Sequence, residues 1–152
     1  MDKPFVLLAD DNEATCTLIT ALLQNDFIVD VARDGGEALE RLKTRQYSVI
    51  LLDLLMPVVD GYAVLDFLRA ERPDLLQSVL VVTASIGSRE MQRLSDYNVR
   101  RVIAKPFEVD ALYYAVRECA GLAGPSSIRG SFMSGGMLLL IAEVLKRASH
   151  LQ

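Results

Sequence analysis

The sequence has few of the residues on which several classes of protein depend. Its 152 residues include one histidine, two cysteines and no tryptophan. Two cysteines cannot form the disulfide framework of a small secreted domain. With a single histidine, His150, they also exclude most zinc sites. The chain has 16 basic and 20 acidic residues, a formal net charge of -4, which argues against binding to the phosphate backbone of nucleic acids.

Long hydrophobic runs are also missing. The longest apolar run late in the chain covers residues 137–142, far below the roughly 20 residues that span a bilayer. The apolar run at residues 5–9 is too short for a secretory signal, and no small-residue cleavage site follows it. We therefore expect a cytoplasmic protein without a membrane segment, in which Cys16 and Cys119 stay reduced.

Strands and helices are expected to alternate along most of the chain. Five short apolar runs have the length of buried strands: residues 5–9, 27–32, 49–52, 79–82 and 102–104. Segments with helical spacing of apolar residues follow them: residues 15–23, a helix capped by Asp34, a helix ending before Pro73, residues 88–97 and residues 109–120. This alternation predicts an α/β fold with a five-stranded parallel sheet and helices on both faces. The doubly wound, flavodoxin-like strand order 2-1-3-4-5 puts the first and third strands side by side.

Polar residues stand at the ends of four of these strands. Asp10 and Asp11 follow the first strand, Asp53 follows the third, Thr83 follows the fourth, and Lys105 follows the fifth. Because the carboxyl ends of parallel strands share one edge of the sheet, we expect the three carboxylates to converge. Clustered carboxylates repel one another unless a cation joins them. Mg²⁺ suits such a site, because it binds carboxylates and phosphate oxygens and keeps several waters.

The chemistry that fits these residues is phosphoryl transfer to a carboxylate. Attack by a carboxylate oxygen on a phosphoryl group would give an acyl phosphate, with the metal and Lys105 neutralising the developing charge. Each residue alone has an ordinary interpretation. Asp10 and Asp11 could form a solvated turn, Asp53 could cap a turn, Lys105 could lie on the surface, and Thr83 could simply end a strand. Their common register at the strand ends favours a site.

Four motifs in this order resemble the receiver domain of two-component response regulators: LADDN at residues 8–12, DLLMPVVDG at 53–61, VVTA at 81–84 and KPF at 105–107. The resemblance covers residues 3–122. It implies that Asp53 is the phosphoacceptor and that Mg²⁺ is held by Asp10, Asp11, Asp53 and the backbone carbonyl of Leu55. It further implies that Thr83 hydrogen-bonds the phosphoryl group, that Lys105 pairs with it, and that the bond from Lys105 to Pro106 is cis.

The resemblance also implies the partners. A sensor histidine kinase or a histidine phosphotransfer protein would donate the phosphoryl group. A downstream protein would read the face formed by the fourth and fifth helices, around residues 88–117. The domain would assist its own phosphorylation and dephosphorylation rather than act as an enzyme with turnover. Arginine and tyrosine are enriched at interfaces, yet a solvated face with packed tyrosines is an equal alternative for this cluster: Arg89, Arg93, Tyr97, Arg100, Arg101, Tyr113, Tyr114 and Arg117.

One residue departs from the family pattern. Val102 stands three residues before Lys105, where members of the family often carry a tyrosine or phenylalanine that acts as a rotamer switch. A phosphorylation-independent scaffold is therefore the alternative function. A third hypothesis, an aspartyl phosphatase or a nucleotide-binding enzyme, is disfavoured because no G-x-G-x-x-G or Walker A motif is present. Leu55 and Ser85 match two variable positions that tune the phosphoryl lifetime in the family.

The end of the chain has a different composition. Residues 123–136 are rich in glycine and serine and predict a flexible linker. Residues 137–151 predict an amphipathic tail helix, with Glu143, Lys146, Arg147 and His150 on one face. This tail could dock on its own domain, pair with a second copy in a homodimer, or result from an added expression segment or from a truncation. About 30 residues are too few for a familiar DNA-binding output domain, so we expect a single-domain regulator or an excised receiver.

Overall fold

The five strands form one parallel sheet in the order β2-β1-β3-β4-β5, as the sequence predicts. The computed structural model describes residues 2–84 and 86–122, so the expected linker and tail helix lie outside the described residues. The strands are β1 (Phe5–Ala9), β2 (Ile28–Ala32), β3 (Val49–Leu52), β4 (Val79–Thr83) and β5 (Arg101–Ala104). Every pair of neighbouring strands is parallel. All five carboxyl ends therefore meet at the same edge.

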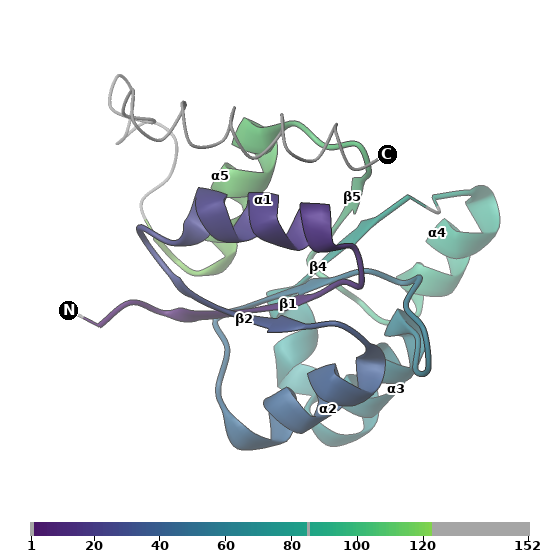
Figure 1. The fold of residues 1–152 in the computed structure, drawn as a ribbon. Coiled ribbons are helices and arrows are strands. Elements are labelled where there is room, and N and C mark those ends of the chain that lie inside the picture. The colour runs from purple at the N-terminus through teal and green to yellow at the C-terminus, as the bar shows by residue number, and fades with distance from the viewer. Residues whose placement is uncertain (1, 85, 123–152) are drawn as a thin grey trace.

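Helices cover both faces of this sheet (Figure 1). The helices α1 (Glu13–Leu23) and α5 (Val109–Cys119) pack on one face. The helices α2 (Gly35–Thr44), α3 (Gly61–Glu71) and α4 (Ser88–Ser95) pack on the other, with a 3₁₀ helix at Pro73–Ser78. This arrangement confirms the doubly wound α/β prediction.

Two separate apolar cores follow from the alternation of side chains along each strand. On β1, Val6 and Leu8 face the core beneath α1 and α5, whereas Leu7 and Ala9 face the core beneath α2 and α3. All five residues of β4 are buried, as a central strand covered on both faces requires. The edge strand β2 is less buried, and its first residue, Ile28, is exposed.

Side-chain caps fix where three helices begin, all next to the carboxyl edge of the sheet. Asn12, Asp34 and Asp60 accept hydrogen bonds from the backbone N–H three residues further on, at 2.8, 2.8 and 3.0 Å. Such caps satisfy N–H groups that the helix itself leaves free. The Asp34 cap confirms the prediction, whereas the Asn12 cap starts α1 two residues earlier than predicted. The fourth helix ends at Ser95, two residues earlier than predicted.

The two cysteines are both free. Cys16 lies on the buried side of α1, where its thiol donates to the backbone oxygen of Asp10 at 3.3 Å. Cys119 is half-buried at the end of α5. Among the described residues, no helix is long and apolar enough to cross a membrane.

Candidate functional site

The pairing of β1 with β3 brings two aspartates together. Ala9 is in register with Leu52, and the N–H of Asp53 donates to the oxygen of Ala9 at 3.0 Å. The residues that follow these two strands, Asp10 and Asp53, therefore leave the sheet side by side. Both are buried, with 2% and 6% of their surface exposed.

Asp11 completes a group of three carboxylates. One oxygen from each of Asp10, Asp11 and Asp53 lies within 4.8 Å of the other two. Asp11 is exposed, so the cluster opens to solvent on its side. A compact set of carboxylate oxygens with one open side matches the preference of Mg²⁺, which keeps several of its waters. The donor set therefore fits the predicted cation.

Lys105 reaches the cluster from the end of β5. Its ammonium donates to Asp10 Oδ2 at 2.6 Å and to Asp53 Oδ2 at 2.9 Å. Burial disfavours the charged amine, but these two bonds outweigh that effect and raise the pKa of Lys105. The amine is thus held protonated beside the carboxylate of Asp53. The peptide bond between Lys105 and Pro106 is cis.

At Asp10 the effect of burial on the pKa outweighs that of the hydrogen bonds, whereas at Lys105 the bonds prevail. Burial raises the pKa of Asp10, and the bonds from Lys105 and from the N–H of Asn12 only partly oppose it. The N–H of Asn12 donates to Asp10 Oδ1 at 2.8 Å, which fixes the carboxylate while Oδ2 faces Lys105. This carboxylate therefore benefits from a further cation.

The loop that follows β3, residues 53–60, orients the carboxylate of Asp53. The N–H of Leu55 donates to Asp53 Oδ1 at 3.1 Å, opposite the oxygen that Lys105 contacts. Leu55 itself is 59% exposed. Its backbone carbonyl remains a predicted metal ligand.

Two glycines hold this loop in place. A Cβ at Gly61 would lie 2.4 Å from the backbone oxygen of Asp53, and a Cβ at Gly35 would lie 2.2 Å from that of Val59. Only glycine allows α3 and α2 to approach the loop so closely. Between them, Val58 has a φ of 66° and is 90% exposed. Such a left-handed conformation is unusual for a β-branched residue.

Thr83 lies at the same edge. It is the last residue of β4 and is fully buried. The N–H of Lys105 donates to the oxygen of Thr83 at 3.0 Å, which ties the ends of β4 and β5 together. Ser85 lies outside the described residues. All five side chains that the sequence selects for chemistry thus stand at one edge of the sheet: Asp10, Asp11, Asp53, Thr83 and Lys105.

The predicted arginine and tyrosine face divides into separate groups. Tyr97 is buried, and its hydroxyl donates to Asp66 of α3 at 2.6 Å. Tyr113 is also buried and donates to Asp26, which follows α1. Arg117 pairs with the same Asp26 at 3.6 Å. These residues serve packing within the domain, in agreement with the packed-tyrosine alternative.

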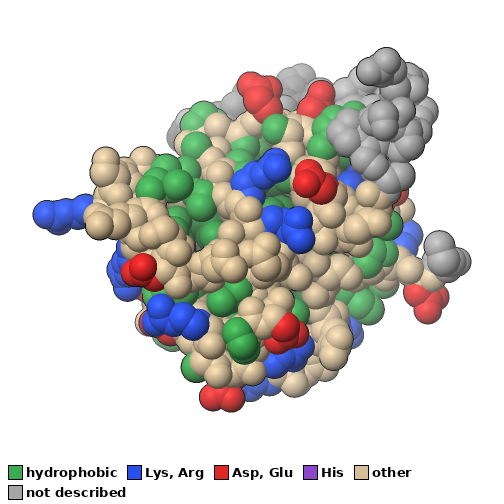
Figure 2. All heavy atoms as spheres, turned by 180° about the vertical axis from the view of Figure 1, so that it is seen from behind, with side chains coloured by type: hydrophobic (Ala, Val, Ile, Leu, Met, Phe, Trp, Pro, Cys, Tyr) green, Lys and Arg blue, Asp and Glu red, His purple; other side chains and the backbone are tan. Residues whose placement is uncertain are grey.

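The exposed surface is mixed in character. Figure 2 shows the face behind that of Figure 1, where basic and acidic side chains stand close together and hydrophobic side chains lie around them. Arg101 of β5 pairs with Glu118 of α5 at 3.8 Å, and both are more than half exposed. Exposed pairs of this kind contribute little stability.

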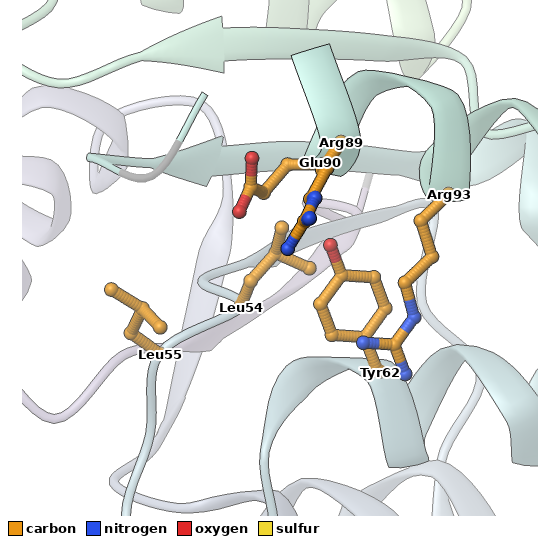
Figure 3. A pocket seen from close by; sticks show the side chains of 6 residues that line it. All are labelled: Leu54, Leu55, Tyr62, Arg89, Glu90 and Arg93. Atoms are coloured by element: carbon orange, nitrogen blue, oxygen red, sulfur yellow. The ribbon is translucent and has the colours of Figure 1, made fainter. Parts of the chain in front are cut away.

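A hollow that the sequence did not predict lies beside the loop at residues 53–60. It has a volume of about 260 Å³ and lies between the loop, α3 and α4. In Figure 3, Arg93 of α4 lies against the ring of Tyr62 of α3, beside Leu54 and Leu55 of the loop. The guanidinium carbon of Arg93 is 3.5 Å from the ring centroid of Tyr62. The arginines were recognised in the sequence, but their partner on α3 had no local signal.

Comparisons with known proteins agree with this geometry. A family model of the response regulator receiver domain matches residues 6–117. The transcription factor SKN7 of Chaetomium thermophilum is 33% identical over 119 residues, which are 76% of this chain but 15% of that protein. The chain thus spans about a seventh of the curated relative that it matches.

Solved structures show the same fold. The receiver domain of the Francisella response regulator 1452 is 29% identical, with a TM-score of 0.67 over 78% of this chain and 98% of that one. The receiver domain of the sensor histidine kinase PA1611 from Pseudomonas aeruginosa is 26% identical, with a TM-score of 0.71 over 79% of this chain and 99% of that one. That structure holds a magnesium ion in its active-site cleft. Because the family model covers most of the folded domain, the chain belongs to the response regulator receiver domain family.

Proposed function

We propose that this chain is a phosphoryl-accepting switch of the two-component type, with Asp53 as the acceptor. The observation that carries the proposal is the position of Lys105, whose protonated amine contacts both Asp53 and Asp10 within a group of three carboxylates. A lysine ammonium beside a buried carboxylate is suited to the charge of a transferred phosphoryl group.

The donor would be a phosphorylated histidine of a kinase or phosphotransfer protein. An oxygen of Asp53 attacks phosphorus, the bond from phosphorus to the imidazole nitrogen breaks, and the imidazole leaves with the electron pair and takes up a proton. Lys105 stabilises the charge on the transferring oxygens, and the N–H of Leu55 keeps the acceptor oriented. The reduced cysteines fit a cytoplasmic location.

Asp10, Asp11 and Asp53, with the carbonyl of Leu55, would hold Mg²⁺. The bound ion would supply positive charge next to the transferring oxygens. Thr83 would donate its hydroxyl to the new phosphoryl group and so draw the end of β4 toward it. The consequence for a partner is a shift between two populations of the surface that includes α4, β5 and α5.

A phosphorylation-independent scaffold is the second candidate. One observation favours it: β5 carries Val102, half-buried, at the position of the family's aromatic switch. The complete set of charged residues at the sheet edge is not needed by a scaffold, and this argues for the switch.

Intact mass after incubation with Mg²⁺ and acetyl phosphate tests the proposal. We expect one phosphoryl adduct in the wild type and none in Asp53→Asn or without Mg²⁺. Asp60→Asn is the matched control, because Asp60 is an exposed carboxylate of the same loop whose capping role asparagine can fill. This variant should be phosphorylated like the wild type.

Beryllofluoride distinguishes the two candidates if the adduct is hydrolysed too fast to be seen. It mimics the phosphoryl group without needing a donor, and it should shift the NMR signals of Thr83 and Lys105. Absence of both the adduct and the beryllofluoride shifts would reject the switch and favour the scaffold.

A further inference from the structure

The hollow between α3 and α4 has a mixed lining. Its floor is Leu54, which is 1% exposed, and Leu55 lies at its open rim. Its wall is the ring of Tyr62, and Arg89, Glu90 and Arg93 approach it from α4. Apolar surface and guanidinium groups thus meet in one small space.

The two arginines are available to a ligand. Both are exposed, and neither forms an ion pair with a carboxylate among residues 2–84 and 86–122. They are four residues apart, so they project from the same side of α4. The contact of its guanidinium carbon with the ring of Tyr62, 3.5 Å from the centroid, restricts the side chain of Arg93. A planar, oriented guanidinium matches a carboxylate through two parallel hydrogen bonds.

Glu90 offsets only part of this charge. Its carboxylate accepts from the N–H of Gly87 at 3.1 Å, directly before α4, and so serves the helix start. Two arginines against one engaged glutamate leave the hollow with an excess of positive charge.

The size of the hollow decides the kind of occupant. Sites for drug-sized ligands and cofactors have volumes of about 300–1,000 Å³, whereas this hollow has about 260 Å³. It has room for one or two side chains and not for a nucleotide or a flavin. An apolar floor beside two arginines fits a protein segment that carries both an apolar side chain and carboxylates.

We propose that this hollow binds an acidic segment of a partner protein. An apolar side chain of that segment rests on Leu54 and Leu55, and a flanking carboxylate bonds to Arg89 and Arg93. This binding surface does not require phosphorylation, so its test is independent of the proposed function. It differs from the surface around β5, because its lining comes from the loop at residues 53–60, from α3 and from the side of α4 that faces α3.

The probe is the peptide acetyl-Glu-Leu-Glu-Leu-Glu-amide, titrated into the full chain without Mg²⁺ or phosphodonor and followed by ¹H–¹⁵N NMR. We expect shifts confined to residues 54–62 and 88–95. Arg89→Gln and Arg93→Gln should each weaken binding about tenfold, the effect of losing one charge-assisted hydrogen bond. Arg101→Gln is the matched control, because it removes the same charge from an exposed site on β5, and it should leave the affinity unchanged.

Two further probes separate the parts of the proposal. The neutral peptide with glutamine in place of glutamate should bind at least tenfold more weakly, and so should the acidic peptide with serine in place of leucine. Equal binding of either peptide would overturn the proposal, as would shifts that spread over the surface or no shifts at all. The same shifts from inorganic phosphate at equal ionic strength would also overturn it, because they would identify a simple anion site.

Discussion

Replacement of Lys105 by glutamine tests whether this lysine holds the site together before any phosphoryl group arrives. The substitution keeps a side chain of similar length but removes the positive charge between Asp10 and Asp53. Both aspartates then stay buried, with Asp11 nearby and no positive partner. Their mutual repulsion and lost pairing must lower the free energy of unfolding.

The expected magnitude follows from the burial of the three groups. Removing one partner from a fully buried ion pair costs about 3–5 kcal/mol. Here 19% of the Lys105 side chain is exposed and Asp11 faces solvent, so water reaches the site. We therefore expect a loss of about 3 kcal/mol at neutral pH without Mg²⁺. With a urea m-value of about 2 kcal/mol/M, the midpoint should fall by roughly 1.5 M.

The loss should depend on pH in a defined direction. The pKa of Asp10 is already raised by burial, so the folded protein holds this proton more tightly than the unfolded chain does. Protonated Asp10 thus favours the folded state at low pH, and this contribution disappears as pH rises above the ordinary aspartate range near 3.9. Without Lys105 the pKa of Asp10 rises further. The gap between wild type and variant should therefore be small at pH 4 and grow toward pH 7.

Urea denaturation with and without Mg²⁺ measures these effects. Mg²⁺ should stabilise Lys105→Gln more than the wild type, because the site of the variant carries one more negative charge. The control is Lys43→Gln, which breaks an exposed pair with Glu40 at 3.6 Å and should cost less than about 1 kcal/mol. If the two variants lose equal stability, or if Mg²⁺ does not favour Lys105→Gln, the reasoning about the site is wrong.

Three further predictions concern other parts of the domain. Val58→Gly should raise the free energy of unfolding by up to about 1 kcal/mol in urea, because relief of left-handed strain exceeds the entropy gained by the unfolded chain; a less stable variant would contradict this. Tyr47→Phe should lose about 2 kcal/mol with the 2.7 Å bond to Asp30. Burial and this bond raise the pKa of Tyr47, so the free energy of unfolding of the wild type should fall above about pH 10. That of the variant should fall less, and parallel curves of stability against alkaline pH would contradict this. Burial raises the pKa of the Cys16 thiol to about 11. In Cys119→Ser, this remaining thiol should therefore react with a disulfide reagent only as fast as urea unfolds the chain, and rapid labelling of the native protein would refute its burial.

The cluster of Asp10, Asp53 and Lys105 could be predicted because it depends on strand ends. Each of Asp10, Asp53 and Lys105 directly follows a strand, and a short apolar run marks its own end in the sequence. Once the strands are parallel and β1 lies beside β3, their carboxyl ends must share an edge. The order of the five strands and the residues at this edge could therefore be predicted from the sequence, and the structure confirms the strand order.

The arginine and tyrosine contacts could not be predicted in the same way. They depend on pairs in which one residue of a helix meets a residue of a distant loop, such as Asp66 with Tyr97 and Tyr113 with Asp26. The sequence shows that arginine and tyrosine are numerous from α4 onward. It does not show which acidic residue each of them contacts. Proximity along the chain suggested one face, whereas the packing of helices on opposite sides of the sheet separates Tyr97 from Tyr113.

The packing between α3 and α4 bears on the missing aromatic residue of β5. Tyr62 and Tyr97 lie with ring centroids 6.3 Å apart, Arg93 stacks on the first ring, and Arg69 stacks on the second at 4.6 Å. This series of ring contacts begins at the loop of residues 53–60. The N–H of Gly61, directly before Tyr62, donates to the oxygen of Leu54 at 3.1 Å.

The backbone bond from Gly61 to Leu54 joins this loop to the first turn of α3, and the stack of Arg93 on Tyr62 joins that turn to α4. Val102 has no ring with which to make such a contact from β5. In this chain the aromatic contact with α4 thus comes from Tyr62 of α3, which directly follows the loop at residues 53–60. A contact between two packed helices transmits a change only if the helices populate two different arrangements. Stacked rings and guanidinium groups can slide over one another with little loss of contact area. Under the proposed function, these contacts place an aromatic link to α4 on α3, whereas position 102 of β5 carries valine.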